Sequence, residues 1–213
     1  TVDIGNTATL TAILTDDNGN IIGTNANIIG KVGDNSVTFV FNDATKKFVA
    51  TYSQTSTKGN YTISGDYTSA TDCTVINGTL TVNTIPIDEF NVDVNSKVYG
   101  NFSGNITILP ANVTGNVSIK VNGTKYSQVE LVGGKADWLF TNITPGNYNV
   151  TFEYSGDDYY SANSTSILVN ISKATANLES NITDHIYGEN TTVKVNVTGI
   201  QGTDLSGNVT VTI

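Results

Sequence analysis

The chain has 213 residues, a net charge of −9 and a pI near 4.3. Its ten basic residues are all lysines, too few to counter a phosphate backbone, so nucleic acid and an anionic membrane surface are excluded as partners. No run approaches 18 apolar residues, which excludes membrane insertion of this segment, and one Cys with one His exclude a disulfide framework and a structural zinc site.

The polar residues are unusual because most of them are neutral: 27 Asn, 33 Thr and 16 Ser stand against 29 charged residues. Thr suits the surfaces of strands, whereas Asn and Gly suit the turns between them. Strong helix formers are scarce, and Met and Arg are absent. The composition therefore predicts an all-β fold.

Residues 1–87 contain short runs in which apolar residues alternate with polar ones, at 37–41, 48–52 and 61–63. Alternation of this kind gives each strand one apolar face, and such strands separated by turn signals are typical of two sheets packed face to face. We expect this segment to lack its opening strand, because Thr1 begins where residues 88–173 already have the run around residues 90–94 behind them.

Residues 88–173 show the same pattern more completely, with alternating runs at 117–121, 148–154 and 167–171. The run at 148–154 is introduced by Thr-Pro145-Gly146-Asn-Tyr148, the arrangement of a tyrosine corner, in which a Tyr hydroxyl bonds backbone a few residues upstream. Tyr148, Pro145 and Gly146 are therefore predicted structural residues, with Tyr148 as an ordinary core residue of the strand being the alternative. Residues 1–87 keep only Gly-Asn-Tyr at 59–61.

Two sequence matches establish an internal repeat. Residues 59–83 align without a gap to residues 146–170 at an offset of 87, and Val-Tyr-Gly at 98–100 matches Ile-Tyr-Gly at 186–188 at an offset of 88. The sequence therefore predicts tandem immunoglobulin-like β-sandwich domains of about 87 residues: 1–87, 88–173, and 174–213 as the first half of a third. In that last part, alternating runs at 193–197 and 208–212 predict strands, and continuation in a longer array is expected.

The runs VYGNFSGNITI (98–108), TGNVSIKVNGTKY (114–126) and ITPGNYNVTFEYSGDDYY (143–160) resemble the bacterial Ig-like repeat of adhesin-like surface proteins of methanogenic archaea. The full set of motifs occurs once, across residues 98–173, and residues 186–213 match its opening half. Residues 1–87 depart from it, since they lack the Pro of the corner. The resemblance implies an Ig-like fold and a role as spacer or presentation stalk on a cell surface.

Asn-x-Ser/Thr sequons are more frequent than composition predicts, since about six are expected by chance and fifteen occur. They lie at Asn60, Asn77, Asn101, Asn105, Asn112, Asn116, Asn122, Asn142, Asn149, Asn163, Asn170, Asn181, Asn190, Asn196 and Asn208. N-glycosylation of an exported protein is one interpretation. The alternative is that an outward-inward-outward strand with an Asn/Thr surface creates these triplets by itself.

Other candidate chemistry is sparse. The carboxylates at 157–158, at 66 and at 88–93 lack the regular spacing of a calcium site and are predicted to be solvated. Cys73 is expected to be a small buried residue, His185 has no nucleophile partner, and Trp138 is expected in the core rather than against a sugar. A Lys97–Asn170 isopeptide is disfavoured, because Asn170 is predicted to face outward.

These observations predict a protein that is not an enzyme and holds no cofactor. The preferred hypothesis is an extracellular, cell-surface adhesin-like protein whose Ig-like repeats act as a stalk or adhesion module. The alternative is a structural subunit of an extracellular filament or surface layer, and a third is a carbohydrate-binding module beside an enzyme. The expected partners are neighbouring repeats of the array, another cell surface or a glycan, or other filament subunits.

Overall fold

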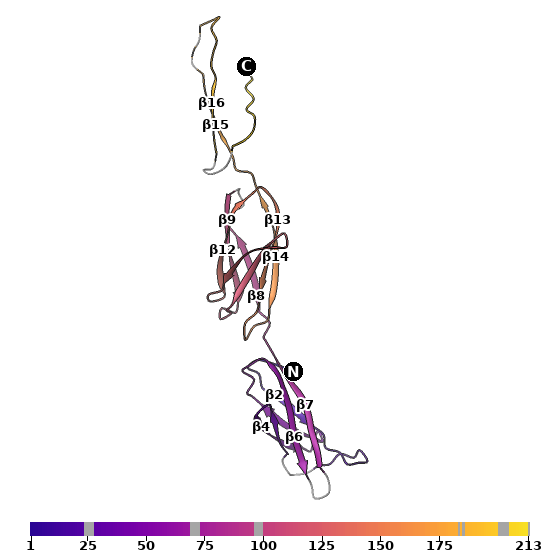
Figure 1. The fold of residues 1–213 in the computed structure, drawn as a ribbon. Helices are drawn as coiled ribbons and strands as arrows, with labels where there is room; N and C mark the ends of the chain where they lie inside the picture. Colours follow the sequence, from indigo (N-terminus) through magenta and orange to yellow (C-terminus); the bar gives the residue numbers. More distant parts are fainter. Residues whose placement is uncertain are drawn as a thin grey trace. The chain divides into compact units, whose positions relative to one another are not determined.

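The computed structural model describes residues 1–23, 28–68, 73–95, 100–182, 184, 186–199 and 205–212. Its elements are all β-strands, and they divide into two compact units (Figure 1). Unit 1 comprises residues 1–88, 113–115 and 155–163, and unit 2 comprises residues 89–112, 116–154 and 164–213. In the part of the chain described, no helix has the length and apolar character needed to cross a membrane.

The strands of unit 1 form one continuous hydrogen-bonded series in the order β1-β7-β6-β3-β4-β5-β2. They are β1 (Val2–Asp3), β2 (Ala8–Ala12), β3 (Ile28–Val32), β4 (Asn35–Asn42), β5 (Lys47–Tyr52), β6 (Gly59–Thr68) and β7 (Cys73–Asn83). β1 pairs in parallel with β7, whereas the other pairs are antiparallel.

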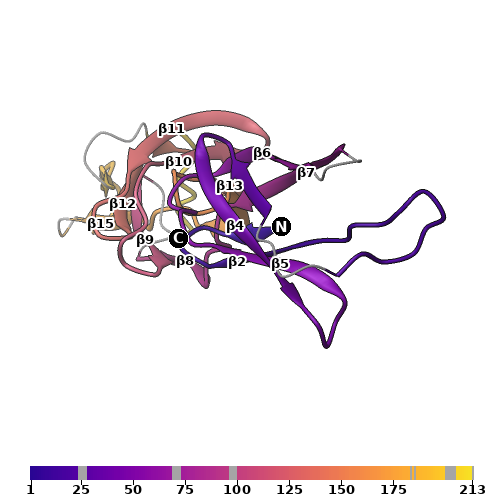
Figure 2. The same ribbon diagram turned by 90° about the horizontal axis from the view of Figure 1, so that it is seen from below.

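Strand β4 connects the two layers of unit 1. Its first five residues pair with β3, and residues 40–42 pair with β5. Figure 2 shows β4 beside β5. The two sets of strands can therefore lie on opposite sides of one core. That core contains Phe39, Phe48 and Tyr52, each with 4% or less of its surface exposed. The alternation predicted for residues 37–41 and 48–52 is what places these rings inside.

Unit 2 contains a three-stranded sheet, β12-β9-β8, and a four-stranded sheet, β11-β10-β13-β14. The strands are β8 (Glu89–Val94), β9 (Gly100–Leu109), β10 (Asn116–Val121), β11 (Thr124–Glu130), β12 (Lys135–Ile143), β13 (Gly146–Tyr154) and β14 (Asn163–Ile171). Figure 1 shows β9 and β12 in one layer and β13 and β14 in the other. Seven antiparallel strands in two layers form an Ig-like β-sandwich, so the predicted fold class is confirmed.

An aromatic cluster fills the core of unit 2. The Trp138 ring, 2% exposed, lies 5.6 Å edge-on from Phe102 and 5.5 Å from Phe152, centroid to centroid. Trp138 pairs across the sheet with Gly104, where a Cβ would come within 2.4 Å of the indole ring. Gly104 therefore makes room for the tryptophan, and the prediction of Trp138 as a core residue is confirmed.

Residues 164–213 of unit 2 include a separate hairpin, β15 (Asn177–Asn181) paired antiparallel with β16 (Lys194–Thr198). Val195 and Val197 are half-buried, whereas every residue of β15 is exposed. The predicted strand at 208–212 is wrong, since residues 205–212 form no strand and Val209 and Val211 are about half exposed. Alternation alone does not make a strand there, because a strand needs a neighbour for its backbone groups.

We predict that Ile119→Ala destabilises unit 2 by about 2–5 kcal/mol, because Ile119 is fully buried in β10 and its removal leaves a cavity. Leu168→Ala is the matched control: its side chain in β14 is 84% exposed, and the expected change is below about 0.5 kcal/mol. Denaturant unfolding followed by fluorescence of the single Trp138 measures both values. Equal midpoints for the two variants would contradict the assigned core.

Candidate functional site

Both sandwiches contain a tyrosine corner. The Tyr148 hydroxyl donates a hydrogen bond to the Thr144 carbonyl oxygen at 2.9 Å and lies at the same distance from the Thr144 hydroxyl. Gly146 lies under the ring, and a Cβ on this glycine would be 3.6 Å from it. In unit 1, the Tyr61 hydroxyl donates to the Thr57 carbonyl oxygen at 2.8 Å.

The corner of unit 1 forms without the proline of unit 2. Lys58 occupies the position equivalent to Pro145, and both residues are exposed. The features common to the two corners are the Tyr, the Gly two residues before it and the accepting carbonyl two residues before that Gly. Pro145 is therefore compatible with the corner but is not needed for it.

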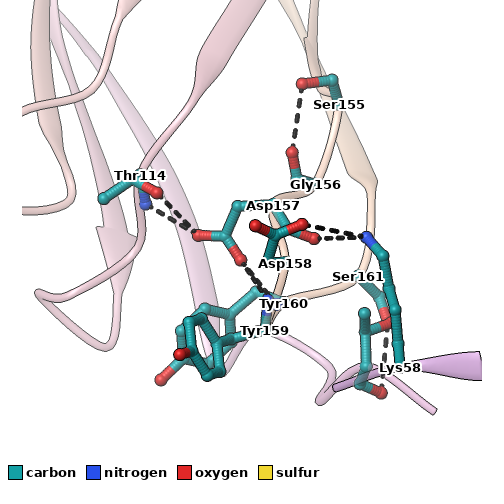
Figure 3. A network of polar contacts seen from close by, with 10 residues as sticks. Lys58, Thr114, Ser155, Gly156, Asp157, Asp158, Tyr159, Tyr160 and Ser161 are labelled. Atoms are coloured by element: carbon teal, nitrogen blue, oxygen red, sulfur yellow. Dashed lines mark hydrogen bonds and ion pairs between the residues drawn. The ribbon is translucent and has the colours of Figure 1, made fainter. Parts of the chain in front are cut away.

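Asp157 organises the turn between β13 and β14. One carboxylate oxygen accepts hydrogen bonds from the backbone N–H groups of Tyr159 at 2.8 Å and Tyr160 at 2.7 Å. The other accepts from the backbone N–H and the hydroxyl of Thr114, each at 3.0 Å (Figure 3). A single carboxylate thus joins residues 113–115 to residues 155–163, both of which belong to unit 1.

Gly156 allows this turn to form. Its φ is +79°, which side chains disfavour, and a Cβ there would lie 2.9 Å from the Tyr160 carbonyl oxygen. The Tyr160 carbonyl accepts the backbone N–H of Asp157 at 3.0 Å, which closes the turn. The Gly-Asp-x-x-Tyr part of the motif is therefore a folding unit, in which the Asp caps the turn and the Tyr is buried to 8% exposure.

The prediction of solvated carboxylates fails for Asp157. Burial acts to raise the pKa of this carboxyl, but hydrogen bonds from Thr114, Tyr160 and Tyr159 outweigh it and hold the pKa below its ordinary value. A lowered pKa in the folded state means that the carboxylate stabilises the fold above a pH of about 4, and that this contribution is lost as pH falls further. Asp158, by contrast, is 95% exposed.

The same turn is hydrogen-bonded to the segment that follows β7. The backbone N–H of Ile85 donates to the Tyr159 carbonyl oxygen at 2.7 Å, and the N–H of Ser161 donates to the Ile85 carbonyl oxygen at 2.9 Å. The hydroxyls of Thr84 and Ser161 lie 2.6 Å apart. These contacts form a short parallel bridge between Ile85 and Tyr160.

Lys58 adds a further link within unit 1. Its ammonium group donates to the Asp157 carbonyl oxygen at 2.9 Å and lies 3.8 Å from the Asp158 carboxylate (Figure 3). The ion pair is exposed and at the limit of contact, so it contributes little by itself. Lys58, which stands where unit 2 has Pro145, therefore contacts the Asp157 turn. The sequence carried no signal for this contact beyond the departure itself.

All fifteen sequon asparagines are exposed. Eleven of them lie in strands, often before a buried residue such as Phe102, Ile106 or Val117, as the alternation explanation requires. Some of their side-chain amides have structural partners: Asn122 accepts from the Asn149 backbone N–H at 2.9 Å, and Asn105 accepts from the Asn95 amide at 3.4 Å. The Asn170 amide donates to the Asn147 side-chain oxygen at 2.6 Å. Exposure fits both explanations, and glycan occupancy stays a prediction.

The remaining candidate residues are not brought together. The described residues contain no group of three or more His, Cys, Asp or Glu that could hold a metal ion. Trp138 and Tyr160 are buried and cannot stack on a sugar, whereas Tyr159 is 55% exposed. His185, Lys97 and the Cys73 side chain lie outside what the structure describes. Asn170 faces outward, as predicted.

Sequence comparison identifies the more complete sandwich. Residues 90–172 match the family described as Bacterial Ig-like domain (group 3). This match covers β8 to β14, the seven strands of the sandwich in unit 2. Domains of this family are typical of surface or extracellular proteins, and their fold is generally non-catalytic. Among curated proteins, no sequence relative of the chain was found.

Solved structures similar to this chain include tandem modules and a multidomain ectodomain. The fibronectin(III)-like modules of Clostridium thermocellum CbhA share 12% identity over 81% of this chain and 88% of theirs, with a TM-score of 0.32. The titin domains z1z2 share 16% identity over 82% and 93%, with a TM-score of 0.37. The ectodomain of mouse nectin-like molecule 4 shares 10% over 93% and 75%, with a TM-score of 0.34. These values add nothing beyond the fold.

We predict that Tyr148→Phe lowers the free energy of unfolding of unit 2 by about 1 kcal/mol, the net contribution of one hydrogen bond. The substitution removes the hydroxyl and keeps the packing of the ring. Tyr61→Phe is the matched control, since it removes the same bond from unit 1. Denaturant unfolding monitored by Trp138, which lies in unit 2, should show a shift for the first variant and not the second. An unchanged midpoint for Tyr148→Phe would show that its bond is energetically neutral.

Proposed function

We propose that this chain is part of an extracellular, cell-surface adhesin-like protein in which Ig-like repeats act as a stalk or adhesion module. The observation that carries the proposal is the match of residues 90–172 to a bacterial Ig-like domain family within a chain that folds as tandem sandwiches. A sandwich holds its two ends apart with a packed core, which suits it to present a distal domain away from a surface.

The chemistry of the described residues supports a mechanical rather than a catalytic role. Asp157 accepts four hydrogen bonds and uses both carboxylate oxygens to organise the turn backbone and Thr114, so neither oxygen is free for acid-base work. The aromatic residues Trp138, Phe140 and Phe152 are buried in packing. We therefore infer that the chain is not an enzyme and that its partners are neighbouring repeats and, through adhesion, another cell surface or a glycan.

A structural subunit of an extracellular filament or surface layer is the second candidate function. It is favoured by the β15–β16 hairpin, in which Leu178 is 56% exposed and Val195 and Val197 are only half-buried. Apolar side chains on an uncovered hairpin can pack against another molecule. The stalk remains the preferred function, because the family match that supports it covers the sandwich of unit 2.

Antibodies raised against this chain should label intact, unpermeabilised cells of the source organism in immunogold electron microscopy. Label on projections above the envelope supports the stalk, and regularly spaced label along fibres or a lattice supports the second candidate. Cells labelled only after permeabilisation would contradict both. Antibodies against a cytoplasmic protein provide the control for membrane integrity.

Stretching the chain in a force spectrometer should give a discrete unfolding peak for the sandwich of unit 2. The expected gain in contour length is roughly 250 Å, because 83 residues extend by about 3.5 Å each and the folded domain already spans part of that length. Ile119→Ala should lower the peak force without changing the gain in length, since it weakens the same core. A smooth extension without a peak would contradict a mechanical role for this sandwich.

A further inference from the structure

We propose that the Asp157 turn is an interaction element through which one repeat binds the end of the preceding repeat, so that the Gly-Asp-x-x-Tyr motif couples neighbours in the array. Residues 155–163 lie in the sequence of the second predicted repeat, yet they belong to unit 1 together with residues 1–88. The proposal rests on the contacts inside unit 1 and does not depend on the stalk function.

Backbone hydrogen bonds form the centre of this interaction. Ile85 uses both its N–H and its C=O, binding the Tyr159 carbonyl and the Ser161 N–H. The stretch after β7 is therefore paired with the Asp157 turn through one parallel β-bridge, between Ile85 and Tyr160. Backbone pairing of this kind requires a partner segment with the right backbone conformation, but it sets few requirements on the identity of that segment's side chains.

Asp157 supplies the conformation that the pairing requires. Its side chain fixes the N–H groups of Tyr159 and Tyr160, so the Tyr159 carbonyl and the Ser161 N–H are presented to Ile85 in a preformed turn. The second oxygen ties this turn to Thr114, which follows the fully buried Val113. Asp157 therefore acts as a positioning residue, since it contacts neither Ile85 nor Thr84 in any described bond.

The surface on the preceding repeat consists of Thr84, Ile85 and Lys58. Thr84 and Ser161 share a hydroxyl–hydroxyl hydrogen bond, and Lys58 binds the Asp157 carbonyl. Tyr160, which pairs with Ile85, is buried to 8% exposure, so its ring is removed from water next to this backbone bridge. Polar side chains thus surround a backbone bridge, and the charged groups at the joint are Lys58, Asp157 and Asp158.

Hydrogen exchange of the full chain tests this inference, measured by NMR at the amides of Ile85 and Ser161. Both amides should be protected in the wild type, and Asp157→Ala should speed their exchange by about tenfold or more, because the turn loses its preformed shape. Asp157→Asn keeps one acceptor oxygen and is expected to have a smaller effect. Asp158→Asn, which removes the same charge one residue away, should leave both rates unchanged.

The two variants at Asp157 are compared only where the amides of the β3–β4 pair keep their protection, which shows that unit 1 is folded, and Trp138 fluorescence shows that unit 2 is folded. Equal exchange rates at Ile85 and Ser161 in wild type and Asp157→Ala would overturn the positioning role. Unprotected amides at both positions in the wild type would overturn the interaction itself. Either result would leave the surface-labelling test of the proposed function untouched.

Discussion

Each strand in the two sandwiches has only one face that an opposing sheet can cover, and the alternation of side chains follows from that constraint. In β10, for example, Val117 and Ile119 are fully buried, whereas Asn116, the first residue of the strand, is exposed. The burial of these inward residues is the main source of stability in a chain that contains a single cysteine. The outward positions do not contribute to this core, so Thr, Ser and Asn can occupy them as well as Lys and Glu can.

The excess of sequons follows naturally from this arrangement. A triplet such as Asn105-Ile106-Thr107 has a buried centre and two polar neighbours that face away from the core. A surface built from Asn and Thr instead of Lys and Glu therefore generates the acceptor sequence wherever a strand alternates. Glycosylation would use positions that the fold has already placed in solvent, so the two explanations do not exclude each other.

Sequence reasoning reaches the parts of this structure that repeat and fails where a contact is individual. The alternating runs predicted the sandwich, and core packing was preferred over sugar stacking for Trp138, which is 2% exposed. The run at 208–212 has the same alternation but forms no strand, because a pattern states which face is apolar and not which neighbour covers it. The fourfold use of the Asp157 carboxylate was missed, since one Asp in a loop carries no periodic signal.

The position shared by Lys58 and Pro145 shows how a repeat can vary without losing its fold. In both corners the Tyr hydroxyl binds a carbonyl four residues upstream, and the residue between that carbonyl and the glycine is exposed. A proline there restricts the backbone and serves the corner alone. A lysine there gives up that restriction but carries three donors on a long chain, which reach the Asp157 carbonyl. The corner tolerates either residue because its bond uses backbone on one side, and the side chain at this position is therefore free to contribute to contacts outside the corner.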